Sequence, residues 1–416
     1  MQIDSLDAYL VRLPLKKPFR MGDIPLESIE TVIVHMQSGG VSGWSEVFPG
    51  NEPILTAAWS RGVFSVLTEC LFPRIKQASR IDSTDRLAEL LAPLKGTRHA
   101  KATLDMAWWD LQSRLDGKPL HTAIGGTREN VETGLVFDRY DDRNRFLDDL
   151  DRAVDEGYRR ITLKIRPGWD IQMLSRVRAS HPMLMIQCDV EESLDMEKHS
   201  DTIYRFDDFM PALLEQPLAA SEYVGHAMLQ DSLRTTICLD ESITTPHQAE
   251  IALDLRSAGT FCLKAGKMGG LSAAKQIHDA AVSAEVDCYS GCEILSSLGY
   301  RFVLAIASLK GCELPADYVR AGEYFENDPG IPLLPQLVET QKEQDEKERV
   351  EHESGESVHF YDENGNPVMD RPIIATGPNL LKQCRRRIIP LWAEPGIGFD
   401  PDLQLIESLA VAKASM

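Results

Sequence analysis

Five charged residues recur at nearly constant intervals through the middle of the chain. They are Lys164, Asp189, Glu215, Asp240 and Lys264, at spacings of 25, 26, 25 and 24 residues, and each stands at the end of a short apolar run. One β-strand, together with the helix that returns the chain to the next parallel strand, takes about this length. The spacing therefore predicts that all five side chains lie at the C-terminal ends of successive parallel strands.

From about residue 130, short apolar runs alternate with amphipathic segments long enough for helices. The predicted strands are 131–137, 161–165, 183–188, 210–214, 236–239, 260–263 and 286–289, and the clearest helices are 142–156, 172–179 and 273–283. Strand–helix alternation of this kind builds a parallel sheet. A closed barrel brings consecutive strand ends to one mouth more readily than an open sheet does, so we predict a (β/α)8 barrel of the TIM type.

The first 125 residues have a different texture and predict an α+β domain. Alternating runs at 3–14, 30–35 and 41–47 indicate strands of a small antiparallel sheet. Residues 100–115 carry apolar side chains at spacings of three and four, which places them on one face of a helix, and Gly117 is a natural stop for it.

Acidic residues outnumber basic ones, and this limits the partners to be expected. The chain has 64 Asp and Glu against 44 Lys and Arg, a formal net charge of −20. Because such a chain repels phosphate backbones and anionic lipids, we expect neither a nucleic-acid nor a membrane partner. The N-terminus lacks the pattern of a signal peptide. The eight cysteines follow no disulfide or zinc spacing, which favours free thiols in a reducing cytoplasm.

The three carboxylates of the periodic series predict a metal site. Asp189, Glu215 and Asp240 on adjacent strands would form a cluster of negative charge that is unstable without a cation. Oxygen ligands suit a hard ion, with Mg²⁺ favoured and Mn²⁺ as the alternative. Lys164 and Lys264 then lie on opposite sides of the metal, where a nearby cation favours the neutral amine and suits a lysine to act as a base.

Several motifs around these residues resemble the enolase superfamily. They are Leu163–Asp170, Gln187–Asp189, Leu214–Pro217, Leu239–Ser242, Leu263–Lys264 with Gly269–Gly270, Ala107–Leu111, Gly117–Leu120 and Gly125–Gly126. A lysine at each end of the carboxylate series is typical of the muconate-lactonizing-enzyme-like subgroup. The string from Lys164 to Asp170 is most similar to o-succinylbenzoate synthases and N-acylamino acid racemases.

The resemblance implies a modified (β/α)8 barrel with an N-terminal α+β capping domain that the C-terminal tail completes. On this basis we expect the capping domain at 1–125, the barrel at 126–315 and the returning segment at 316–416. That segment contains an apparent insertion at about 338–388, which is an oligomer contact, a lid or surface decoration. The resemblance also implies that loops at 20–23 and 48–51 close over the substrate.

The resemblance implies chemistry on a small carboxylate substrate. Mg²⁺ would hold the carboxylate, Lys164 or Lys264 would remove the adjacent α-proton, and loss of water would yield o-succinylbenzoate for menaquinone synthesis. A racemase or other cycloisomerase would use both lysines as acid–base partners. A metal-binding, non-catalytic homologue is a third hypothesis, and a homo-oligomer is left open.

The sequence departs from the family pattern near the predicted site. Thr162 stands where a lysine is usual, and Glu191 replaces an asparagine. Glu241 either hydrogen-bonds a catalytic lysine or caps the next helix. The family's seventh-strand motif corresponds to Ser290 and Gly291, followed by Glu293 in an offset position; Glu293 lies either behind Lys264 or in a solvated loop.

Overall fold

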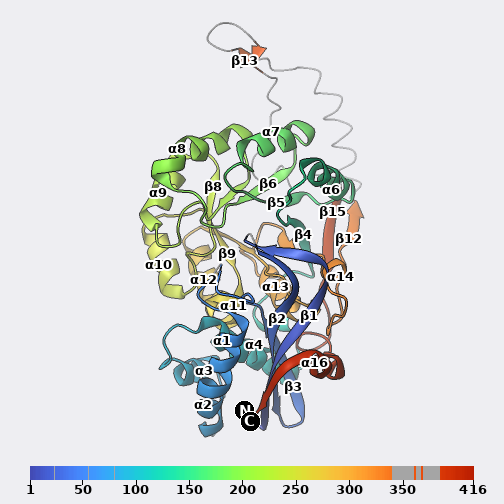
Figure 1. Cartoon of the computed structure of the whole chain (residues 1–416). Helices are drawn as coiled ribbons and strands as arrows, with labels where there is room; N and C mark the ends of the chain where they lie inside the picture. The colour runs from blue at the N-terminus through green and yellow to red at the C-terminus, as the bar shows by residue number, and fades with distance from the viewer. Residues whose placement is uncertain (23, 55, 79, 340–359, 362–366, 369–384) are drawn as a thin grey trace.

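The computed structural model describes residues 1–416 apart from 23, 55, 79, 340–359, 362–366 and 369–384. An antiparallel sheet with the strand order β16-β1-β2-β3 forms the lower part of the molecule in Figure 1. Its strands are β1 (Ser5–Met21), β2 (Ile24–Ser38), β3 (Val41–Val47) and β16 (Ala410–Ser415). Because β16 pairs with β1, the two chain ends lie side by side.

Helices accompany this sheet. They are α1 (Ser60–Ser65), the π-helical η1 (Val66–Leu71), α2 (Phe72–Gln77), α3 (Thr84–Leu91), α4 (Arg98–Leu115) and α5 (Leu120–Ala123), with α16 (Leu403–Leu409) before β16. Of these, α4 packs against β2 and β3, α1 contacts β1 and β2, and α16 contacts β1. The helix predicted at 100–115 is α4. It approaches β3 so closely that a side chain at Gly43 would stand 2.5 Å from the Leu111 Cβ atom. None of the described helices is long and apolar enough to cross a membrane.

Asp110 of α4 ties this sheet to the C-terminal tail. Its carboxylate is fully buried and accepts hydrogen bonds from the backbone N–H of Trp44 at 2.8 Å and of Ile397 at 2.7 Å. The Arg114 guanidinium, one turn along α4, lies 3.2 Å from the same carboxylate. The C-terminal tail at Ile397 is therefore held against α4 by a buried charge.

A closed barrel of eight parallel strands occupies the upper part of the described chain (Figure 1). The strands are β4 (Asn130–Phe137), β5 (Arg160–Lys164), β6 (Met185–Asp189), β7 (Leu213–Glu215), β8 (Thr236–Leu239), β9 (Thr260–Leu263), β10 (Asp287–Ser290) and β11 (Ala316–Tyr318). Each pairs with the next from β4 to β10, and β11 pairs in parallel with β4. A parallel bridge between Cys288 and Cys312 brings β10 alongside the chain leading to β11 and closes the ring.

Helices surround the barrel and connect its strands. They are α6 (Arg143–Asp155), α7 (Ile171–Ser180), α8 (Met196–Arg205), η2 (Phe206–Phe209), α9 (Tyr223–Ser232), α10 (Pro246–Asp254), α11 (Ala265–Met268), α12 (Leu271–Ser283), α13 (Ser297–Ala307) and α14 (Ala321–Tyr324). All seven predicted barrel strands are present. The predicted strand 210–214 begins later, at Leu213, because Met210 adopts a left-handed conformation with φ 43° and Pro211 has no N–H to donate.

The barrel extends past the expected boundary at residue 315, because its closing strand is β11. The segment 316–416 also contributes β12 (Gln336–Glu339) and β15 (Arg385–Pro390), which pair with each other antiparallel on the outer edge of β4. Two short strands, β13 (Phe360–Tyr361) and β14 (Pro367–Val368), pair antiparallel within the apparent insertion. Most of the apparent insertion predicted at about 338–388 lies outside the described residues.

Replacing Asp110 by Ala is expected to destabilise the fold without touching the barrel mouth. The change removes the acceptor for two buried N–H groups and leaves the Arg114 charge without its buried partner. Removal of one partner from a buried ion pair costs about 3–5 kcal/mol. Urea unfolding followed by circular dichroism should show this loss. Asp116→Ala, an exposed change just beyond the same helix, should shift stability by less than about 0.5 kcal/mol; equal stability of the two variants would contradict the bridging role of Asp110.

Candidate active site

The structure brings the five periodic residues to one end of the barrel. Lys164, Asp189 and Glu215 are the last residues of β5, β6 and β7, and they stand opposite one another in register. Asp240 and Lys264 directly follow β8 and β9. Because all these strands are parallel and adjacent, their side chains meet at the C-terminal mouth, where barrel enzymes carry their active sites.

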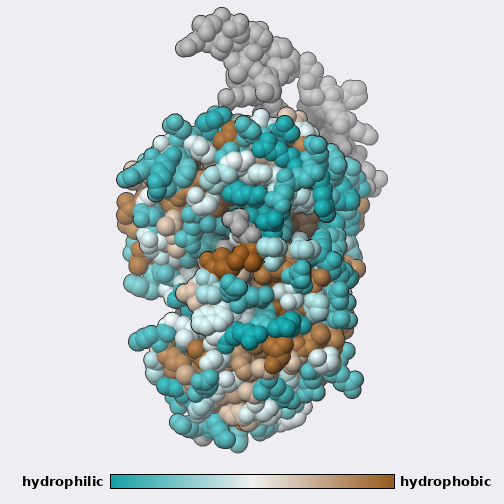
Figure 2. Space-filling model, in the orientation of Figure 1, coloured by the Kyte–Doolittle hydropathy of each residue, from teal (hydrophilic) through white to brown (hydrophobic). Residues whose placement is uncertain are grey.

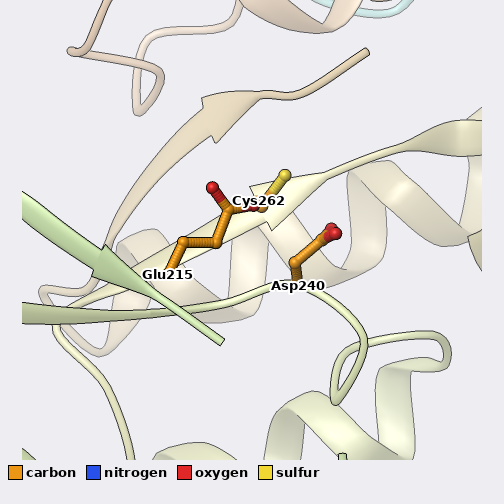
Figure 3. A group of neighbouring side chains, drawn as sticks. All are labelled: Glu215, Asp240 and Cys262. Carbon is orange, nitrogen blue, oxygen red and sulfur yellow. The ribbon is translucent and has the colours of Figure 1, made fainter. Parts of the chain in front are cut away.

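Two of the predicted metal ligands lie close together, and the third is displaced toward a lysine. The carboxylates of Glu215 and Asp240 and the Sγ atom of Cys262 each provide an atom within 4.8 Å of the others (Figure 3). Asp189 accepts instead from the Nζ atom of Lys164 at 2.6 Å. Burial raises the pKa of the Cys262 thiol well above its ordinary value. Cys262 therefore fits the role of a small core residue better than that of a ligand for a hard cation.

Both predicted catalytic lysines are held by carboxylates. Lys164 donates to Asp189 and, at 2.8 Å, to Glu191, while Lys264 donates to Asp240 at 2.8 Å. Burial acts to lower the pKa of each lysine, but these negative charges outweigh it and raise both pKa values well above the ordinary range. From the sequence we predicted that a bound cation lowers the pKa of each lysine and so favours the neutral amine. The carboxylate contacts instead raise the pKa and favour the ammonium form.

Lys267 is a site residue that was not predicted from the sequence. It is buried and donates to both the carboxylate and the backbone carbonyl of Asp240. Lys264 and Lys267 together lower the pKa of Asp240 far below its usual range, against the effect of burial. The sequence spacing could have indicated Lys267 as a site residue. In a helix, a residue three positions after Lys264 returns to the same side, and here the helix is the single turn α11.

A second layer of polar residues fills the barrel beneath the lysines. Arg160 is fully buried, and its guanidinium donates to Thr162, to Gln187 and, at 2.6 Å, to Asp317. Gly134 makes room for it, since a Cβ atom there would meet the Arg160 side chain. The period-two pattern of a strand puts Arg160 and Thr162 on the same inward face as Lys164, which was the sequence signal for this layer. Thr162 therefore accepts a hydrogen bond from Arg160 in the position where a second lysine is usual.

The environment of Glu215 fits a divalent cation. Its side chain is buried and accepts from the amide of Gln187, while its partners in the described chain include no lysine or arginine donor. Burial, reinforced by Asp189 and Asp240, raises the pKa of Glu215 to about 8. The Oε2 atom of Glu241 is also buried without a hydrogen-bond partner. Carboxylates in such positions have oxygen atoms free for a hard cation.

The remaining predicted residues take different positions. Glu191, with φ 49°, bridges Lys164 and Arg139, the latter at 2.7 Å. Glu241 makes neither of its two predicted contacts: it hydrogen-bonds no lysine among the described residues, and Thr245 caps α10 through the Gln248 N–H. Because Thr245 already caps α10, Glu241 is not needed as its cap. Glu241 instead lines the cavity at the barrel mouth, beside Asp240.

The loop after β10 has one residue whose small size matters to Lys264. Ser290 donates to the backbone carbonyl of Val303 at 2.8 Å and so packs the barrel wall. A Cβ atom at Gly291 would collide with the Cys262 sulfur and stand 2.7 Å from the Cε atom of Lys264. Glu293 lines the same cavity as Lys264, as one of its two predicted positions requires.

A cavity of about 570 Å³ separates the barrel mouth from the capping domain. Arg20 and Met21 from the end of β1, and the segment Phe48–Gly50 after β3, line it opposite Lys164 and Lys264. Both loops predicted to close over a substrate therefore contribute residues to its wall. On the face shown in Figure 2, the surface is mostly hydrophilic, with a compact hydrophobic patch at the junction of the two parts.

The chain matches known families along most of its length. Residues 6–125 match the family described as the mandelate racemase / muconate lactonizing enzyme N-terminal domain, and residues 145–355 match the enolase C-terminal domain-like family. The chain therefore belongs to the enolase superfamily, in its mandelate racemase / muconate lactonizing enzyme branch.

Its relatives include enzymes of two activities. An o-succinylbenzoate synthase from Geobacillus kaustophilus is 33% identical over 76% of this chain and 84% of its own length. An N-succinylamino acid racemase from Thermus thermophilus is 32% identical over 79% of this chain and 88% of its own. The crystal structure of an enolase superfamily member from Listeria innocua superposes with a TM-score of 0.82 at 23% identity, covering 100% of this chain and 99% of the other. These matches confirm the predicted family and fold.

Gly291→Ala is expected to displace Lys264 and slow turnover while the protein stays folded. The added methyl group must push aside the lysine chain or the Cys262 sulfur, and displacement of a catalytic group by about 1 Å costs on the order of 100-fold in rate. The matched control is Gly322→Ala, where an added Cβ meets nothing within 4 Å. Steady-state kinetics and thermal melting of both variants check this. Full activity of Gly291→Ala would remove the steric role.

Proposed function

We propose that the chain is an Mg²⁺-dependent lyase of the o-succinylbenzoate synthase type. It would remove a proton α to a carboxylate and eliminate water. The observation that carries the proposal is the placement of Lys164 and Lys264 at the C-terminal ends of β5 and β9, with the strands of the three carboxylates between them. The similarity to named o-succinylbenzoate synthases supports the reaction type. That reaction would place the chain in cytoplasmic menaquinone synthesis.

The residues that would hold the metal are Asp189, Glu215 and Asp240. Their oxygen donors fit Mg²⁺, with Mn²⁺ as the alternative. When bound, the ion supplies a positive charge that orients a substrate carboxylate and stabilises the negative charge developing beside it. The orphaned Glu241 oxygen close to Asp240 supports a cation at this place.

The two lysines would divide the proton chemistry between them. Lys164 accepts the α-proton as the C–H bond breaks, and it returns that proton to the departing hydroxyl as the C–O bond breaks and the C=C bond forms. The new C=C bond completes an aromatic ring, and the other product is one water molecule. The Lys264 ammonium, on the other side, stabilises the charge that develops on the substrate. Carboxylates hold Lys264 protonated for this role; they raise the pKa of Lys164 as well, so Lys164 must lose its proton before it can act as the base.

An N-acylamino acid racemase is the second candidate, and one observation favours it. Both lysines line the same cavity from opposite sides, which a racemase needs for removing a proton on one face and returning one on the other. Relatives named N-succinylamino acid racemase support this reading as well. A non-catalytic homologue has less support, because the relatives are enzymes.

Incubation with Mg²⁺ in D₂O distinguishes the two reactions. The wild-type protein would be given the cyclohexadiene precursor of o-succinylbenzoate and, separately, N-succinyl-L-phenylalanine. Dehydration of the first without α-deuterium in the second supports the synthase. Deuterium exchange accompanied by racemisation supports the racemase, and the absence of both reactions would overturn the proposal.

Lys164→Ala is expected to abolish whichever reaction the wild type performs, because the base that removes the α-proton is lost. The rate should fall by at least about 100-fold, the lower range for a positioned general base. Lys198→Ala is the matched control, since Lys198 is an exposed lysine of α8. Nuclear magnetic resonance of the α-proton in D₂O measures both variants. Retained activity in Lys164→Ala would remove this lysine from the mechanism.

A further inference from the structure

The polar layer inside the barrel contains an ordered series of contacts that ends at a proposed metal ligand. Asp317 on β11 accepts from Arg160 on β5 at 2.6 Å, and Arg160 donates to Gln187 on β6. Gln187 in turn donates to Glu215 on β7. Each of these residues is at most 5% exposed. Because buried polar groups take their hydrogen bonds from one another rather than from bulk water, the orientation of each depends on its neighbour.

Arg160 determines which way the Gln187 amide faces. A guanidinium has donors and no acceptor, so Gln187 must turn its Oε1 oxygen toward Arg160. The Nε2 atom then faces the opposite way and donates to Glu215 and to the Tyr289 hydroxyl, the latter at 2.8 Å. If the amide were reversed, the Arg160 N–H would face the amide N–H, and the Glu215 carboxylate would face the amide oxygen. Both contacts would be repulsive, so Arg160 and Glu215 together permit one orientation.

The guanidinium of Arg160 is itself held at several points. Its Nη1 atom also donates to the Oγ1 atom of Thr162 at 2.8 Å. Asp317, which accepts from its Nη2 atom, accepts in addition from the backbone N–H of Cys292 at 3.2 Å. A guanidinium bound on both of its terminal nitrogens cannot turn away from Gln187 without breaking other buried contacts. Arg160 is therefore a fixed point from which the Gln187 amide is aimed.

The effect of this order is seen at Glu215. Its Oε2 atom accepts from Gln187, which leaves the other carboxylate oxygen for a cation. Glu215 and Asp240 already provide oxygen atoms within 4.8 Å of each other (Figure 3). A carboxylate that is held in one orientation loses less freedom when it binds a metal. Partners of this kind, which orient a ligand from behind, change metal affinity by about 10- to 100-fold.

We propose that Arg160 is a positioning residue of the metal site, which acts through the Gln187 amide to hold Glu215 in place for the cation. The inference rests on the proposed function, because it takes Glu215 as a ligand of Mg²⁺. Neither Arg160 nor Gln187 lines the cavity at the mouth, so their effect reaches the site through Glu215. If Arg160 only balanced the buried charge of Asp317, loss of the Gln187 amide would leave metal binding unchanged.

Calorimetric Mg²⁺ binding to the metal-free protein tests this role without relying on turnover. Gln187→Met nearly keeps the length of the side chain and leaves the pair of Arg160 and Asp317 in place, but it removes the donor to Glu215. We expect this variant to bind Mg²⁺ about 10- to 100-fold more weakly than the wild type. Urea unfolding followed by circular dichroism measures its stability in parallel.

A second variant tests whether Arg160 acts through Gln187. Arg160→Met combined with Asp317→Asn removes the buried pair together, so that no single charge is left buried. It should also weaken Mg²⁺ binding, because the Gln187 amide is then free to turn. Adding Gln187→Met to this variant should cause little further loss, as expected for residues that act in series.

The matched control is Arg178→Met. Arg178 is a buried arginine of α7 that donates to backbone carbonyls, among them those of Leu184 at 2.7 Å and Phe209 at 2.9 Å. Its loss should lower the urea midpoint and leave Mg²⁺ affinity at the wild-type value.

Wild-type Mg²⁺ affinity in Gln187→Met, or a full additional loss when Gln187→Met is added to the pair variant, would overturn the positioning role alone. An equal loss of affinity in Arg178→Met would also overturn it, because general destabilisation would then explain the effect. Absence of Mg²⁺ binding in the wild type would overturn the proposed metal site, and this inference with it.

Discussion

The rest of this structure depends on three carboxylates that are buried at the mouth of one barrel. Asp189, Glu215 and Asp240 end adjacent strands, and each is less than one-tenth exposed. Like charges in a medium of low polarity repel strongly unless cations lie among them. Lysines from β5, β9 and α11 supply part of that compensation, but they contact Asp189 and Asp240 rather than Glu215. The negative charge of Glu215 has no such lysine contact, and a divalent cation would balance it.

Two sets of elements hold these charges in place, one inside the barrel and one in the capping domain. Deeper in the barrel, the buried pair of Arg160 and Asp317 joins β5 to β11, the two strands that flank β4, and orients Gln187 toward Glu215. On the other side of the mouth, the capping domain closes a cavity whose wall includes the start of α4. The same helix is bound to the C-terminal tail through Asp110, so the ends of the chain and the roof of the cavity form one connected unit.

The sequence predicted the barrel and its five charged strand ends because both follow from periodicity. Strand length and helix length together fix the spacing of the charges, and parallel strands bring them to one edge. Arg160 and Lys267 were not predicted for different reasons. Arg160 begins its strand far below the mouth, and its burial depends on the absence of a side chain at Gly134, a residue of another strand. Lys267 acts from a helix of one turn, too short to be recognised by pattern.

Contacts between distant loops were equally beyond the sequence pattern. The steric role of Gly291 toward Lys264 depends also on the sulfur atom of Cys262, which lies on the neighbouring strand β9. Glu241 was assigned to a lysine or a helix cap, because the sequence does not show that Thr245 satisfies the helix and leaves the acid facing the mouth. Such outcomes depend on three-dimensional competition for hydrogen bonds rather than on local spacing.

The net charge of −20 says little about what this cavity binds, because lysines at the mouth locally offset part of its carboxylate charge. We propose that one divalent cation completes this group of carboxylates and lysines. Calorimetric titration of the metal-free protein with Mg²⁺ tests this most directly. We predict saturable binding of one ion per chain, and binding should be lost when Glu215 is replaced by Gln. Absence of saturable binding in the wild type, or unchanged binding in Glu215→Gln, would contradict the account.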